Sequence, residues 1–194
     1  MNKRFEKKTR NPTRMTVTLL PRNRSGQVWI ETVIYTLIAF VMIGLILSYA
    51  TPKIQEAQDQ AIIQQSVEMM KEIDSTILTI GATGNQRVIE IGIKKGDLKI
   101  DGINNKLIFE IESQSIYSEP GKNINDGSVV VLTEEKSGYN LVTLTNDYGE
   151  TYNIKFEGAD ILKKISKSST SYKLTILNEG ADANGKIVLD FSLG

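Results

Sequence analysis

The chain has 194 residues, of which 40% are hydrophobic and 24% are charged, a composition typical of folded proteins rather than of disordered chains. Its length suits one ordinary domain with an appendage. It contains no cysteine and no histidine, which excludes a disulfide framework, thiolate chemistry and every site that depends on an imidazole.

The formal net charge of zero conceals a separation of charge along the chain. Residues 1–25 hold eight basic side chains and one acid, Glu6, so 15 basic and 22 acidic residues remain, a net charge of −7. A basic start before an apolar segment indicates that the first residues stay in the cytoplasm. The acidic remainder argues against nucleic acid as a partner, because it would repel phosphates.

The first predicted element is a long helix. Residues 32–52 form a run of 21 residues without a charged side chain, and about 20 apolar residues suffice to cross a membrane as a helix. Residues 53–80 then become amphipathic, with apolar positions spaced by seven, four, four and three residues, as on one helix face. These positions are Ile62, Met69, Ile73, Ile77 and Ile80. We therefore expect one helix over residues 27–80, ending at Gly81 and Gly84.

From Arg87 onward the hydrophobic period becomes two, which predicts β-strands. The alternating stretches are 89–93, 107–111, 152–156, 172–176 and 187–191. Turn signals separate them at 95–97, 101–102, 121, 126–127, 137–138, 147–149 and 178–180. The predicted fold class is α+β, with a basic leader at 1–26, the helix at 27–80 and an antiparallel β-sandwich head at 87–194.

One acid, Glu31, stands directly before the charge-free run, with Gly26 and Gln27 shortly ahead of it. A carboxylate at the start of a membrane helix is rare, and it usually has a functional role and a partner. The simpler interpretation is an interfacial residue that lies level with the lipid headgroups and pairs with nothing.

This order of parts resembles archaeal type IV pilins and related proteins with a class III signal peptide. The resemblance covers residues 22 to about 80 and rests on Gly26, Gln27, Glu31 and the apolar run. It implies that a prepilin peptidase cuts between Gly26 and Gln27, so that Gln27 begins the mature chain and Glu31 is its fifth residue. Its departures are Val28-Trp29-Ile30, where a small or hydroxyl residue is usual, and a long leader, which starting at Met15 would shorten to 12 residues.

Cleavage would give Gln27 a free α-ammonium, which Glu31 of a neighbouring copy can meet in a staggered helix bundle. A wrong stagger would leave an unpaired ion, at a cost of several kcal/mol. An N-terminal Gln can also cyclise and lose its charge, and Glu31 would then need a hydrogen-bond partner or stay protonated. The partners implied are copies of the chain in a helical filament, the prepilin peptidase, and an assembly ATPase with its platform protein.

The predicted protein is thus a structural subunit and not an enzyme. Its precursor sits in the membrane with a cytoplasmic N-terminus and an external head, and the mature form joins a cell-surface filament. The alternatives are an uncleaved, signal-anchored surface binding protein, a minor tip pilin whose β head recognises a ligand or surface, and a secreted protein released from a signal peptide.

The head offers no catalytic constellation, and no cofactor or metal is expected there. Residues 166–171 are rich in serine, and residues 167–171 are predicted to form a polar loop. Asp182, Asn184 and Gly185 have the look of half a calcium loop. The bidentate glutamate of such a loop is missing at the required distance, and Asn-Gly is mainly a turn signal.

Overall fold

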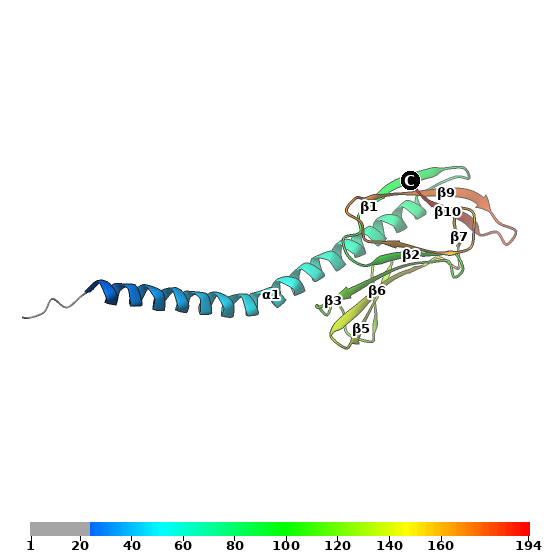
Figure 1. Cartoon of the computed structure of the whole chain (residues 1–194). Helices are drawn as coiled ribbons and strands as arrows, with labels where there is room; N and C mark the ends of the chain where they lie inside the picture. The colour runs from blue at the N-terminus through cyan, green and yellow to red at the C-terminus, as the bar shows by residue number, and fades with distance from the viewer. Residues whose placement is uncertain (1–23) are drawn as a thin grey trace, which may run out of the picture. The chain divides into compact units, whose positions relative to one another are not determined.

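The computed structural model describes residues 24–194, with side chains from Val28 onward, so residues 1–23 of the predicted leader lie outside it. The fold is α+β, as expected: helix α1 (Arg24–Leu78) precedes a mostly antiparallel β head (Figure 1). The chain divides into two compact units, which meet between Leu47 and Ser48. The second half of α1 therefore belongs to the same unit as the strands, and α1 continues through Pro52 without a break.

The strands of the head form two sheets. The four-stranded sheet has the order β1 (Gln86–Ile91), β9 (Tyr172–Ala181), β10 (Ile187–Leu193) and β7 (Tyr152–Phe156). The six-stranded sheet has the order β4 (Asn123–Asp126), β5 (Val129–Lys136), β6 (Tyr139–Asp147), β3 (Lys106–Ser113), β2 (Asp97–Asp101) and β8 (Leu162–Ser166).

One strand pair departs from the antiparallel prediction, because β10 and β7 run parallel, with Leu189 opposite Ile154. Parallel neighbours need a long crossover, whereas antiparallel ones can be joined by a tight hairpin. Here β8 and β9 lie between the two strands in the sequence and supply that crossover. The pairing of β7 is thus set by chain topology, which alternation of apolar residues does not encode.

The five alternating stretches lie in or directly beside β1, β3, β7, β9 and β10, as predicted. The predicted turn at 178–180 is wrong, since these residues lie inside β9. Val188 faces Gly180 and Leu189 faces Asn178, so one extra residue bulges out of β9. Gly180 has a φ of 97°, and its N–H donates to Asn178 Oδ1 at 2.8 Å. The Asn-x-Gly signal therefore encodes a β-bulge rather than a chain reversal.

The second half of α1 supplies part of the head's core. The fully buried positions on the helix are Ile63, Val67, Met70, Ile73 and Ile77, each with 0% exposure. They join buried side chains of both sheets, among them Phe109, Val131, Ile176 and Phe191. The predicted stripe is correct at Ile73, Ile77 and Ile80, whereas Ile62 and Met69 are only partly buried at its margin. The fully buried positions from Ile63 to Ile77 are spaced by three or four residues, as expected for one helix face. In its first half this face includes Ile63 and Met70 in place of the predicted Ile62 and Met69.

Within the head, α1 contacts one outer strand of the six-stranded sheet, β4, and the segment that directly follows β1, an outer strand of the four-stranded sheet. Lys71 on the helix pairs with Asp126 of β4, and Gln65 accepts a hydrogen bond from Lys94, just after β1. In Figure 1 the last turns of α1 lie between the strands of the two sheets. The helix therefore fills the interior that the two sheets would otherwise leave open to water.

Candidate membrane-spanning and assembly segment

The first half of α1 is apolar on every side. All side chains from Val28 to Tyr49 are exposed, including Leu37 at 59%, Phe40 at 74% and Leu45 at 62%. The most apolar stretch has a mean hydropathy of 2.3, and none of it is buried. By length and composition this helix can cross a membrane. A continuous apolar surface of this size is not stable in water and requires lipid or other protein chains around it.

The threonine hydroxyls in this segment are satisfied within the helix. Thr32 Oγ1 donates to the Val28 carbonyl at 3.0 Å. Thr36 Oγ1 lies 2.9 Å from the carbonyls of both Thr32 and Val33. Bonds of this kind let a hydroxyl sit in hydrocarbon, because its donor stays paired with the backbone. The two threonines therefore make no demand for an external partner.

Glu31 and Tyr35 differ from these threonines. Glu31 is exposed, and Tyr35 is exposed to 70%. Among the residues whose side chains the structure describes, none bonds to the Glu31 carboxylate or to the Tyr35 hydroxyl. Because the two residues are four apart on a helix, they lie on the same face. Within the described side chains, an acceptor and a donor thus lie on one face of an apolar helix without a bond to either.

The predicted cleavage site lies in the first turns of α1, where both Gly26 and Gln27 are helical. The side chain of Gln27 falls outside the described part of the chain. Glycine lowers helix stability by about 1 kcal/mol relative to alanine. Gly26 therefore weakens the helix at the bond that a peptidase would have to unwind and hold extended.

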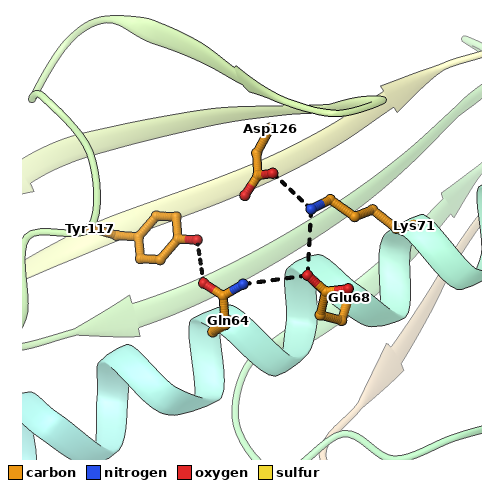
Figure 2. Close-up of polar contacts among 5 residues, drawn as sticks. All are labelled: Gln64, Glu68, Lys71, Tyr117 and Asp126. Atoms are coloured by element: carbon orange, nitrogen blue, oxygen red, sulfur yellow. Dashed lines mark hydrogen bonds and ion pairs between the residues drawn. The ribbon is translucent and has the colours of Figure 1, made fainter.

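A polar network that sequence patterns did not predict fastens α1 to the head (Figure 2). Tyr117 Oη donates to Gln64 Oε1 at 2.9 Å, and Gln64 Nε2 donates to Glu68 Oε1 at 3.4 Å. Lys71 Nζ lies 3.4 Å from Glu68 Oε1 and 2.7 Å from Asp126 Oδ1. The hydrogen bond to Asp126 is the main reason that the pKa of Lys71 is raised. The contacts made by Tyr117 and Asp126 join residues more than 50 positions apart, so only the general polarity of these residues is visible in the sequence.

Near the C-terminal end of α1 a second polar group is buried. Tyr148 Oη donates to Asp74 Oδ1 at 3.0 Å and accepts from Asn146 Nδ2 at 3.2 Å. Burial raises the pKa of Tyr148 well above its usual value, so the hydroxyl stays protonated and donates to Asp74. The network holds the end of β6 against the helix.

The remaining candidate positions in the head behave as turn and loop residues. Asp182 Oδ1 accepts the backbone N–H groups of Asn184 at 2.8 Å and Lys186 at 3.0 Å, so its carboxylate closes the β9–β10 hairpin. Residues 167–171 form the loop between β8 and β9, as predicted. In residues 24–194 no group of three or more acidic side chains is placed to hold a metal ion.

The described chain thus combines an exposed apolar helix segment, an exposed acid near its start, and a β head whose core contains the second half of the same helix. Comparison with protein-family models, with curated proteins and with solved structures gives no match.

Proposed function

We propose that this chain is a structural subunit of a type IV pilus-like surface filament, held in the membrane as a precursor and assembled through α1. The observation that carries the proposal is the helix segment from Val28 to Tyr49, which is exposed and apolar on all sides yet continuous with a folded head. Lipid would cover this surface before assembly, and the helices of other copies would cover it afterwards.

Glu31 gives the assembly its register. Cleavage after Gly26 leaves an α-ammonium on Gln27, four residues or about 6 Å along the helix from Glu31. Parallel copies that pack with the correct stagger bring the carboxylate of one to the ammonium of the next. Other staggers leave both ions unpaired in an apolar interior, which costs several kcal/mol. The pair therefore selects one arrangement among many that bury the same apolar area.

The head faces the solvent in this proposal. The chain after residue 25 carries a net charge of −7, which keeps neighbouring filaments apart and soluble. The required partners are further copies of the chain, a prepilin peptidase on the cytoplasmic side, and a membrane-bound assembly ATPase with its platform protein. No enzymatic activity is assigned to the head.

The first test is the N-terminal sequence and intact mass of the protein isolated from native membranes. The proposal expects a chain that begins at Gln27, in its free or cyclised form. A chain that keeps Arg22 and Arg24 would contradict cleavage, and would identify the protein as an uncleaved, signal-anchored surface protein.

The second test is the effect of Glu31→Ala on filaments sheared from cells. We expect normal membrane insertion and a loss of filaments, because insertion needs only the apolar surface whereas register needs the carboxylate. Glu56→Ala is the matched control, since Glu56 lies on the same helix outside the apolar run and pairs with Lys53 at 2.8 Å. Glu31→Ala filaments at wild-type yield would refute the register mechanism.

A further inference from the structure

Gln27, Glu31 and Tyr35 are evenly spaced along α1, each four residues from the next. Four residues are slightly more than one turn and rise about 6 Å. All three positions therefore lie along one face, with Glu31 midway between the other two. The register mechanism uses Gln27 and Glu31 but leaves Tyr35 without a role.

Tyr35 has the properties of a hydrogen-bond donor that awaits a partner outside its own chain. Its side chain is 70% exposed, and no bond within the described part of the chain reaches its hydroxyl. The hydroxyls of Thr32 and Thr36, in the same segment, are paired with backbone carbonyls. Glu31, one turn away, is an acceptor that likewise has no bond to any described side chain. In a water-free interior both groups are strongly destabilising unless each finds a partner.

Because the three positions are equally spaced, a single axial offset between two copies of the helix allows two contacts at once, Tyr35 with Glu31 and Glu31 with Gln27. When two parallel copies are offset by four residues, Tyr35 of the displaced copy lies level with Glu31 of the first. The same offset brings Glu31 of the displaced copy level with Gln27 of the first. The hydroxyl-to-carboxylate bond and the ammonium-to-carboxylate pair therefore select the same stagger of about 6 Å.

We infer that Tyr35 is a second register residue, whose hydroxyl donates a hydrogen bond to the Glu31 carboxylate of a neighbouring copy. The inference rests on the proposed filament assembly and adds a partner for Glu31 that does not depend on the charge of Gln27. If Gln27 cyclises, the phenol still supplies a donor to the carboxylate. Tyrosine is also common where membrane helices meet the headgroups, and an anchoring role of that kind would need the ring but not the hydroxyl.

Tyr35→Phe tests this distinction, because it removes the hydroxyl and keeps the ring. Tyr49→Phe is the matched control, since Tyr49 lies on the same helix and is 73% exposed. The full-length variants are produced in the native cells, and three quantities are measured: sheared filaments, protein retained in the membrane, and the mature N-terminal mass. A lost hydrogen bond to a charged group corresponds to about a tenfold to hundredfold lower filament yield.

The expected result is that Tyr35→Phe lowers filament yield by this factor, while Tyr49→Phe, membrane retention and cleavage stay at wild-type levels. In a Glu31→Gln background, adding Tyr35→Phe should lower the yield by no more than about twofold, because the shared bond is already weakened. Equal yields of wild type and Tyr35→Phe would overturn the inference and leave the filament proposal standing. Equal losses in Tyr35→Phe and Tyr49→Phe would also overturn it, because the effect would then not be specific to the position of Tyr35. Absence of filaments from the wild type would refute both.

Discussion

The Asp59 carboxylate on α1 lies 2.5 Å from the Lys95 ammonium, and its other oxygen accepts the backbone N–H of Gln114 at 2.7 Å. Asp59 is only 6% exposed. A charged side chain is rarely buried unless it is paired, and these two contacts supply the partners of Asp59. This one residue therefore connects the helix to the β1–β2 connection and to the segment that follows β3. Toward the N-terminus from this point, most side chains of α1 are exposed.

The first prediction concerns the dependence of the head on its helix. A chain of residues 48–194 should be a soluble, folded domain, because it keeps the buried helix positions and omits most of the exposed apolar segment. A chain of residues 81–194 should fail to fold, since it lacks five side chains that are fully buried in the core, Ile63, Val67, Met70, Ile73 and Ile77. Circular dichroism and amide proton dispersion would distinguish the two. A folded 81–194 chain would contradict the observed core.

The second prediction concerns Asp59 itself. In the 48–194 chain, Asp59→Ala should lower the free energy of unfolding by about 1–3 kcal/mol, mainly because the Gln114 N–H loses its acceptor. The loss stays within this range because Lys95 is 38% exposed and regains water. Glu56→Ala is the control, with an expected change within about 0.5 kcal/mol, since its pair with Lys53 is exposed. Urea denaturation measures both, and equal changes would show that Asp59 is not a stabilising contact.

The third prediction concerns the β9 bulge. Gly180→Ala should destabilise the head more than Gly185→Ala, although both residues have positive φ, 97° and 80°. Left-handed backbone costs a non-glycine residue about 1–2 kcal/mol at either site. At Gly180 the added Cβ would also lie 3.0 Å from Thr83 Cγ2, whereas the space at Gly185 is open. Urea midpoints of the 48–194 chain would test the order. A reversal would mean that the bulge tolerates a side chain.

The fourth prediction concerns acid stability. Burial alone would raise the pKa of Asp101, but hydrogen bonds from the Asn104 side chain and from the backbone N–H groups of Asn104 and Ile103 lower that pKa below 3.8. The unfolded chain therefore binds this proton first as the pH falls. The stability that Asp101 contributes is present above pH 3.8 and is lost as the pH falls through the folded-state pKa.

Asp101→Asn should accordingly lower the free energy of unfolding at pH 7 by about 1–2 kcal/mol. The difference between wild type and variant should shrink as the pH is lowered below about 5, because the carboxylate becomes protonated first in the unfolded chain and then in the folded one. Denaturation curves of the 48–194 chain across this range provide the test. A difference that grows on acidification would contradict the assigned direction of the pKa shift.

Local patterns in the sequence predicted much of the fold. The helix could be predicted because the charge-free run passes directly into an amphipathic stripe, with Pro52 as the one proline between Arg24 and Leu78. Alternation located strands such as β3, in which Leu107, Phe109 and Ile111 are all buried. These features depend on neighbours along the chain, and a period of two or of 3.6 residues records them directly.

Features that depend on distant residues were missed or mistaken. The parallel pairing of β7 with β10 depends on where β8 and β9 lead the chain. The Asn178–Gly180 segment carries a turn signal, but its residues pair with β10, so the chain forms a bulge within β9 rather than a turn. In the candidate assembly segment, Glu31 stood out because it is the one charged residue between Arg24 and Lys53. Tyr35 did not, because its significance lies in a hydroxyl left unpaired while the nearby threonines are paired.

The continuity of α1 with the core of the head has a mechanical consequence. A tension applied along the second half of α1, which belongs to the head, acts lengthwise on a helix whose buried side chains pack against both sheets. Such a load acts in shear, so that the buried contacts from Ile63 to Ile77 and the bonds of Asp59 and Lys71 must rupture almost together. A domain suspended from a flexible linker would instead peel apart one contact at a time. The head is therefore built to withstand pulling along its own helix.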